Sequence, residues 1–173
     1  YLIAMTATPW TTSGYIYGEG KFWPKPCYEF TIEDAINAGY LCDYELISSA
    51  FKFDTSKYKK RNREFTEKEV LAIIKNGKAE KQVEEFLHLM RDRDKVAVIC
   101  SNIEHAEKIR KIILLKGEQC AIVHSGLSNA NKIAVDWKTD DVKYSVSVAM
   151  ISEGYDNPRI DGIVLLRPTK STR

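Results

Sequence analysis

Gly154 and Asp156 are the residues whose types and spacing most clearly fit a chemical task. They lie in a short loop between two apolar stretches, 145–151 and 163–166, that have the composition of buried strands. A glycine lets a ligand approach the backbone closely, and a carboxylate accepts hydrogen bonds from ligand hydroxyl groups. Because ligands of α/β proteins bind at the carboxyl ends of parallel strands, this loop predicts a nucleotide or sugar-phosphate partner.

Two other apolar stretches, 96–100 and 120–123, also end in small polar residues. These residues are Ser101, Asn102, His124, Ser125 and Gly126. Each has a plain structural interpretation: a helix cap for Ser101, a packed or solvated histidine for His124, and a turn for Gly126. If the three strand ends share one edge of a parallel sheet, their hydroxyls and amides would instead contact a sugar–phosphate backbone without reading bases.

The rest of the sequence has the pattern of an α/β fold. Capping residues and amphipathic spacing predict helices over 31–39, 66–76, 79–91, 101–117 and 128–138. The predicted caps include Thr31 and the capping box of Thr66 with Glu69. Apolar runs predict strands over 1–9, 45–53, 96–100, 120–123, 146–150 and 163–166. The last four strands alternate with helices, which predicts a parallel sheet covered by helices on both faces.

Composition sets wide bounds on function. The 173 residues carry a net charge of +2, with 44% hydrophobic and 29% charged residues. These values are ordinary for a globular chain, and the net charge argues neither for nor against nucleic-acid binding. A positively charged binding surface would therefore have to be local. The densest basic run, 57–63, is interpreted either as a solvated loop or as a phosphate-contacting segment. The length predicts one domain, or one domain and part of another.

Several common sites are not expected. The four cysteines form no C-x-x-C pair, so no metal site is predicted, and Cys100 and Cys120 are interpreted as small buried hydrophobic residues. Reduced thiols, without a membrane-span or signal-peptide pattern, favour a cytoplasmic protein. The glycines at 18 and 20 do not form a Walker A loop, because Phe22 follows Lys21 where serine or threonine is needed.

Five segments carry a family resemblance. Residues 6–9 resemble motif III of superfamily 2 helicases, 96–102 resemble motif IV, 153–158 resemble motif V, and 167–169 resemble the strand end that leads into motif VI. Residues 28–41 resemble the connector in the branch that contains type I and type III restriction-enzyme R subunits and related DNA-repair helicases. The resemblance covers nearly the whole chain, and the ordered set is more specific than any single motif.

The resemblance implies a three-layer αβα fold of the RecA-like, P-loop NTPase type with a mainly parallel sheet. Residues 1–9 would be the last strand of a first RecA-like domain, and residues 10–44 the connector between domains. Residues 45–173 would be the second RecA-like domain, ending before motif VI. The first residue falls inside a strand pattern, so we expect a piece excised from a longer protein.

The resemblance also implies roles for the site residues. ATP, bound with Mg²⁺ in the intact protein, would be approached by Glu153, Gly154 and Asp156. Coupling between the ATP and nucleic-acid sites would fall to Thr6, Ala7 and Thr8. Phosphates of the bound strand would be contacted by Ser101, Asn102, His124, Ser125 and Gly126.

The chain departs from the family pattern in three places. Val148 stands where many relatives have a threonine that touches the strand, and Lys132 only loosely replaces an arginine of the helix after the 124–126 loop. The arginine finger of motif VI would lie beyond Arg173, and the Walker A loop would precede residue 1. We therefore expect no catalytic residue within the chain, ATP hydrolysis by the intact protein, and none by this fragment alone.

Three functions remain open on the sequence. The first is the C-terminal motor half of an ATP-dependent DNA helicase or translocase, with restriction-modification or repair proteins as partners and no membrane. The second is the same half of an RNA helicase, which the connector disfavours. The third is a non-catalytic nucleic-acid-binding module. A Gly-Lys-Thr loop upstream would favour either helicase over this module.

Overall fold

A computed structural model of the chain describes residues 2–11, 14–51, 54, 65–75, 78–151 and 155–168. The chain divides into two compact units, Tyr1–Ile47 and Ser48–Arg173, each with its own internal contacts. No helix in the described ranges is long and apolar enough to cross a membrane.

The first unit has little regular structure. It holds a two-residue antiparallel pair, β1 (Trp10–Thr11) with β2 (Gly14–Tyr15), and the helix α1 (Ile32–Asn37). Thr31 caps α1 as predicted, because its side chain accepts a hydrogen bond from the backbone N–H of Asp34. Gly39 follows the helix with a φ of 77°, a left-handed conformation that a glycine adopts without strain.

The strand predicted over residues 1–9 is not formed. Residues 2–9 belong to no strand in the described part of the chain, although the carbonyl of Pro9 accepts a hydrogen bond from the backbone N–H of Ile16, and Leu2, Ile3 and Met5 are exposed. An apolar strand is stable only between other strands that satisfy its backbone and bury its side chains. The prediction was wrong for this chain because the described residues of the first unit form only the short pair of β1 with β2, and the segment does not join it.

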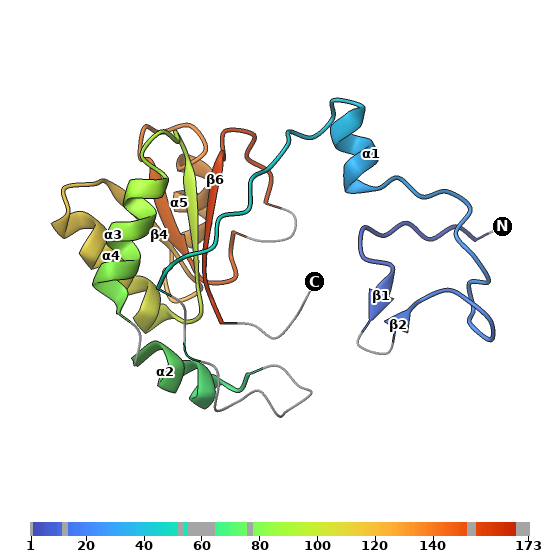
Figure 1. Cartoon of the computed structure of the whole chain (residues 1–173), viewed down its shortest axis with the longest axis horizontal. Coiled ribbons are helices and arrows are strands. Elements are labelled where there is room, and N and C mark those ends of the chain that lie inside the picture. The colour runs from blue at the N-terminus through green and yellow to red at the C-terminus, as the bar shows by residue number, and fades with distance from the viewer. Residues whose placement is uncertain are drawn as a thin grey trace. The chain divides into compact units, whose positions relative to one another are not determined.

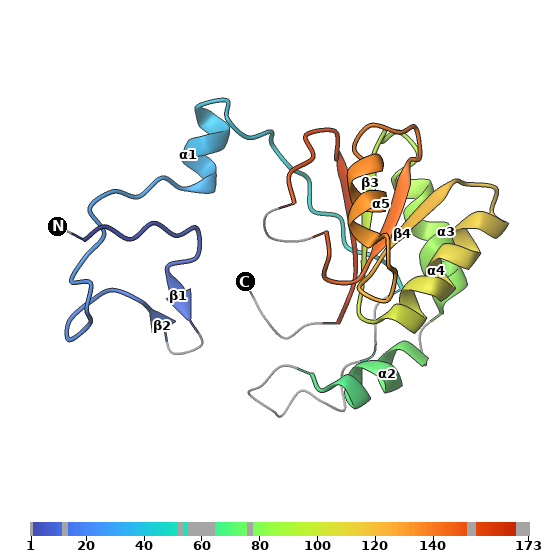
Figure 2. The ribbon, with the colours of Figure 1, turned by 180° about the vertical axis from the view of Figure 1, so that it is seen from behind.

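The second unit is built on four parallel strands, β3 (Val96–Cys100), β4 (Cys120–Val123), β5 (Tyr144–Ser147) and β6 (Gly162–Leu166). Their order in the sheet is β4-β5-β3-β6. The helices of this unit are α2 (Glu67–Lys75), α3 (Ala79–Leu89), α4 (Ile103–Leu115) and α5 (Ala130–Asp136). Figures 1 and 2 show α5 on the opposite side of the sheet from α3 and α4. The predicted α/β fold with a parallel sheet between helices is confirmed, and this architecture is consistent with a RecA-like domain.

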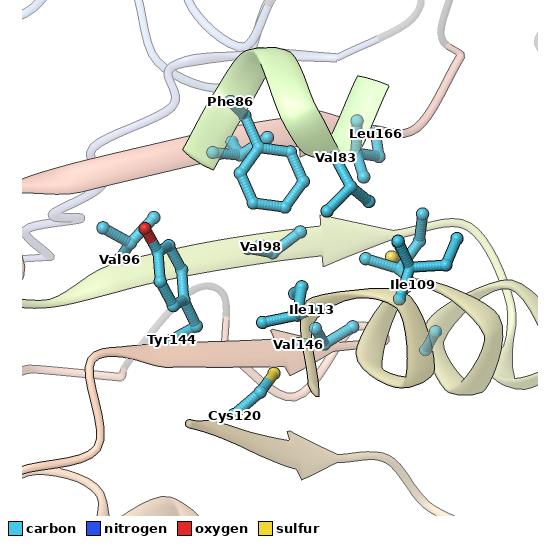
Figure 3. Packing of buried hydrophobic residues seen from close by; sticks show 14 of the residues in the cluster. Val83, Phe86, Val96, Val98, Ile109, Ile113, Cys120, Tyr144, Val146 and Leu166 are labelled. Atoms are coloured by element: carbon cyan, nitrogen blue, oxygen red, sulfur yellow. The ribbon is translucent and has the colours of Figure 1, made fainter. Parts of the chain in front are cut away.

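Alternating side chains of the strands make the three layers. In β3, Val96 and Val98 pack toward α3 and α4, where Val83, Phe86 and Ile109 meet them (Figure 3). Ala97, between them in sequence, packs on the other face against Trp137, which follows α5. Cys100 and Cys120 belong to the core as predicted, and burial raises the pKa of each thiol to about 12. Both thiols are therefore protonated at neutral pH and act as packing groups.

Two predicted strands differ from the structure. Of the one over 45–53, the described residues 45–51 form no strand: Ser49 and Ala50 instead donate hydrogen bonds to the carboxylate of Glu85 on α3, and Phe51 accepts one from Gln82. β5 begins and ends earlier than its predicted range of 146–150, and its early end is explained by the φ of 56° at Ala149. A left-handed residue ends strand pairing, since its peptide groups no longer face a neighbouring strand.

Candidate functional site

The register of the sheet brings its four carboxyl ends to one edge. Cys100 pairs with Leu166, and Val123 pairs with Ser147, which in turn pairs with Ile99. The residues that follow the four strands are therefore neighbours on this edge: Ser101, His124, Val148 and Arg167. We call this edge the carboxyl edge. It brings together the two groups of polar strand ends that the sequence singled out for nucleic acid.

Ser101 and Asn102 join β3 to α4, but their tasks differ from the predicted ones. Asn102, not Ser101, is the N-cap of α4, and its side chain accepts a hydrogen bond of 2.8 Å from the backbone N–H of His105. Ser101 lies outside the helix, with its Oγ 3.5 Å from the carbonyl oxygen of Leu166. The cap occupies one amide of the first turn, and Glu104 places a negative charge beside the others. Ser101 is thus the better placed of the two for a phosphate.

His124 shapes the loop that follows β4. Its side chain is 5% exposed, and its Nδ1 accepts a hydrogen bond of 3.2 Å from the backbone N–H of Gly126. The proton of the neutral ring is then on Nε2, which lies 3.4 Å from a carboxylate oxygen of Glu107 on α4. The buried histidine therefore stabilises the loop through hydrogen bonds within the protein, while Ser125 and Gly126 are exposed.

Gly126 is needed for the close approach of this loop to α4. A Cβ at this position would lie 3.1 Å from His124 Nδ1 and 3.4 Å from Ile103 Cδ1. Any larger residue would have to displace a ring that is held on both of its nitrogens. The absence of a side chain at Gly126 thus leaves room for the His124 ring, and Ser125 beside it is exposed.

The end of β5 is strained beside this loop. The N–H of Val148 donates to the carbonyl of Val123 at 3.1 Å, which extends the pairing of β5 with β4 by one residue. Ala149 then takes its left-handed φ, an uncommon conformation for a residue with a Cβ. Backbone strain of this kind costs about 1 kcal/mol or more and is concentrated at functional sites.

Tyr155 anchors the segment that holds Asp156. Its hydroxyl donates a hydrogen bond of 2.7 Å to the carbonyl of Ala134 in α5, and its ring is stacked on Trp137. Burial raises the pKa of Tyr155, so the hydroxyl keeps its proton and remains a donor at neutral pH. Asp156 itself is exposed, as a ligand-contacting carboxylate must be. Glu153 and Gly154, the other predicted nucleotide contacts, lie outside the described residues.

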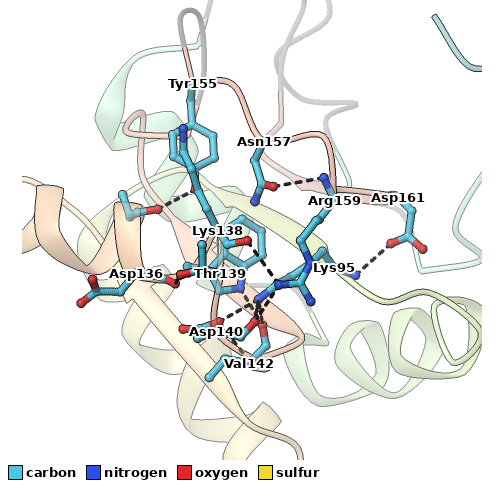
Figure 4. A network of polar contacts seen from close by, with 12 residues as sticks. Lys95, Asp136, Lys138, Thr139, Asp140, Val142, Tyr155, Asn157, Arg159 and Asp161 are labelled. Carbon is cyan, nitrogen blue, oxygen red and sulfur yellow. Dashed lines mark hydrogen bonds and ion pairs between the residues drawn. The ribbon is translucent and has the colours of Figure 1, made fainter.

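A polar network holds the opposite edge of the sheet and the turn before β6 (Figure 4). Lys95 is buried, and its Nζ donates to both the carbonyl and the carboxylate of Asp140 and to the carbonyl of Val142, at 2.7–2.8 Å. The carboxylate of Asp161 accepts the backbone N–H groups of Asp94 and Lys95. Arg159 also donates to the carbonyl of Asp140. Each charge has its partners within the network, so we assign this network to stability and not to ligand binding.

The predicted coupling residues Thr6, Ala7 and Thr8 lie exposed in the first unit, where the side chain of Thr6 accepts a hydrogen bond from the backbone N–H of Thr8. The basic run at 57–63 lies outside the described residues. Within the described ranges, His, Cys, Asp and Glu side chains form no cluster that could hold a metal ion.

Three residues of the site were missed at the sequence level. Glu107 had a detectable signal, because it lies one helical turn beyond the start of α4 and can face the 124–126 loop. The aromatic ring of Tyr155 was visible but had no assigned partner. The left-handed Ala149 has no sequence signal, since alanine is not a residue that favours that conformation.

Comparisons with known proteins give distant similarities. No protein-family model matches the chain. A protein of Lactococcus phage (isolate 7-9), named only as a 51.5 kDa protein, is 24% identical in an alignment of 176 residues that covers 98% of this chain and 37% of the phage protein. Among solved structures, the chain is similar to the Hef helicase domain of Pyrococcus furiosus, with a TM-score of 0.47 and 18% identity, over 58% of this chain and 23% of that chain. The chain thus spans little more than a third of its phage relative, and its fold assignment rests on the strand topology above.

Proposed function

We propose that this chain is the C-terminal motor half of an ATP-dependent DNA helicase or translocase. In this proposal the carboxyl edge binds the strand phosphates, and the segment with Asp156 meets ATP and its Mg²⁺. Restriction-modification or repair proteins are the expected partners, and the cytoplasm is the expected location. The Walker A loop and the arginine finger would come from sequence outside residues 1–173, so hydrolysis belongs to the intact protein.

One observation carries the proposal: the sheet register gathers the polar ends of separate strands at a single edge. Ser101 and Ser125 offer hydroxyl groups there, the loop around Gly126 offers exposed backbone, and Arg167 adds a positive charge. Such groups bind phosphates without selecting bases, as a protein that moves along a strand requires. The ordered helicase-like motifs of the sequence support the same function.

Binding to nucleic acid tests the first half of the proposal. The intact protein would be titrated with dye-labelled single-stranded DNA, duplex DNA and RNA at several salt concentrations. Ser125→Glu places a negative charge on the carboxyl edge, and Gln119→Glu places the same charge at the exposed amino end of β4. We expect the first variant to weaken binding about tenfold and the second to have little effect. Equal affinities for both variants would contradict the assignment, and a preference for RNA would favour the RNA helicase.

ATP hydrolysis tests the second half. We expect DNA-stimulated hydrolysis by the intact protein, lowered by Asp156→Asn through a higher KM for ATP. Asp141→Asn is the matched control, because Asp141 is also exposed but lies just before β5, at the opposite edge of the sheet. A protein that binds DNA and never hydrolyses ATP would instead be the non-catalytic binding module.

A further inference from the structure

The outer face of α4 carries a stripe of partly exposed side chains. The side of the helix that holds Ile109 and Ile113 packs against the sheet (Figure 3). Another side carries the stripe, which we call the α4 stripe and which consists of Ile103, Glu107, Arg110 and Leu114. The two apolar members, at its ends, are 40% and 44% exposed, although the core of this unit is close by.

The α4 stripe has the spacing of a seam between two helices. Its members follow one another at intervals of four, three and four residues, which is the pattern of the core positions in a coiled coil. Glu107, Arg110 and Leu114 also line a shallow hollow, which a side chain of another helix can enter. Single exposed apolar residues are common on protein surfaces and carry no argument by themselves. Here two of them stand at the ends of one seam, about 16 Å apart along the helix, with a carboxylate and a guanidinium between them.

This seam is complementary to itself. Two copies of α4 that pack antiparallel about a two-fold axis place the first half of one stripe against the second half of the other. Ile103 then lies against Leu114 of the other copy, and Glu107 lies against Arg110 of the other copy. Beside the seam, Glu104 comes opposite a lysine of the other copy, Lys111. Each contact occurs twice, so each apolar group meets an apolar group and each charge of the seam meets its opposite.

The two charged members of the stripe can pair with another copy without losing their present contacts. The Nε of Arg110 donates to the carbonyl of Cys120 at 3.1 Å, and the terminal nitrogens of the guanidinium carry its remaining N–H donors. One carboxylate oxygen of Glu107 lies 3.4 Å from His124 Nε2, and the Glu107 side chain is 50% exposed. A guanidinium that is already held at one nitrogen loses less conformational freedom when it binds a carboxylate than a fully mobile one does.

We infer that two copies of this chain associate through α4, with the helices antiparallel and Glu107 of each copy paired with Arg110 of the other. The association involves residues of the second unit alone and is independent of the proposed motor function. A single pair of short helices buries a small area, so the dimer should dissociate at roughly micromolar concentrations.

Sedimentation equilibrium of the intact protein over a range of concentrations measures the dissociation constant of the dimer. Glu107→Arg and Arg110→Glu each bring like charges together across the axis, and each should weaken the dimer about tenfold. Combined in one protein, the two reversals restore opposite charges and should return the dissociation constant to near the wild-type value. Lys108→Glu is the control, because it makes the same change of charge as Arg110→Glu at an exposed position of α4 outside the seam. It should leave the dimer unchanged.

The double variant separates pairing across the axis from effects on folding. It lacks the original contacts of Arg110 with Cys120 and of Glu107 with His124, so a purely structural effect would leave its dimer as weak as those of the single variants. That result would overturn the inference. A wild-type protein that stays monomeric up to about 100 µM would overturn it as well. So would a dimer that Arg110→Glu does not weaken, because the association would then use another surface.

Discussion

Gly126 is the residue at which the geometry of the 124–126 loop bears most directly on the proposed nucleic-acid contact. Gly126→Ala would press a methyl group against His124, whose ring is held by the Gly126 N–H and Glu107. We expect loss of that hydrogen bond, a decrease of about 1 kcal/mol in the free energy of unfolding, and weaker DNA binding by the intact protein. Urea denaturation and DNA titration measure the two effects. Wild-type values in both would mean that the loop absorbs the methyl group without moving the histidine.

His105 predicts a pH dependence at the residue scale. Burial, and secondarily the charge of Lys108, lower the pKa of this histidine from 6.5 to about 4. The folded protein thus binds the proton less tightly than the unfolded chain does. Stability is therefore fully present above pH 6.5 and falls as the pH decreases toward 4, with a slope that approaches about 1.4 kcal/mol per pH unit.

Urea denaturation of the wild-type protein and of two histidine variants between pH 4 and pH 7.5 separates the contribution of His105 from the titration of acidic residues. His105→Leu should flatten the slope, because the buried ring that resists protonation is gone. His88→Leu, at an exposed position of α3, should keep it. Parallel slopes in all three proteins would show that His105 does not control acid stability.

At the scale of elements, β5 contains two buried hydroxyl groups that lower the free energy of unfolding. The hydroxyl groups of Ser145 and Ser147 are buried and have no hydrogen-bond partner among the described residues. A buried unpaired hydroxyl is less favourable than a methyl group of similar size. Ser147→Ala should therefore raise the free energy of unfolding by about 1 kcal/mol, whereas Ser128→Ala at an exposed position should change it little. Destabilisation by Ser147→Ala would indicate that the hydroxyl has a partner after all.

The sequence predicted elements well where local signals and tertiary contacts agree. The cap at Thr31, the capping box of Thr66 and Glu69, and the apolar run of β3 all formed as expected. Local pattern failed where the outcome depends on distant residues. Residues 2–9 are apolar enough for a strand but join no sheet in the described part of the chain, and β5 is ended by a backbone conformation that alanine does not encode.

In the candidate site, the polar strand ends were predictable because parallel strands place their carboxyl ends together. Asn102 as the actual cap differs from the prediction by one residue, which is the usual error in placing a helix start. Helical spacing could have placed Glu107 near the 124–126 loop, but the contact of Tyr155 with Ala134 could not be predicted, since it joins residues from separate elements without a local signal.

At the scale of the whole molecule, the two units differ in the size of their hydrophobic cores. Among the described residues of the first unit, Ala35 is the only buried hydrophobic one, whereas the second unit buries side chains from all four strands and from α3, α4 and α5. Amides of α1 should exchange with solvent rapidly and those of β3 and β5 slowly in this chain, as hydrogen exchange with mass spectrometry would measure. Comparable protection of α1 would mean that the first unit folds as firmly as the second.

The fluorescence of the buried Trp137 can report on the segment that contains Asp156. The chain has three tryptophans. Trp10 is 37% exposed, Trp23 is half-buried, and Trp137 is fully buried between Lys95 and Tyr155. With Trp10 and Trp23 replaced by phenylalanine, all indole emission would come from the residue against which the Asp156 segment is anchored. Fluorescence of that single-tryptophan protein would then follow motion of the segment in real time, without an attached dye.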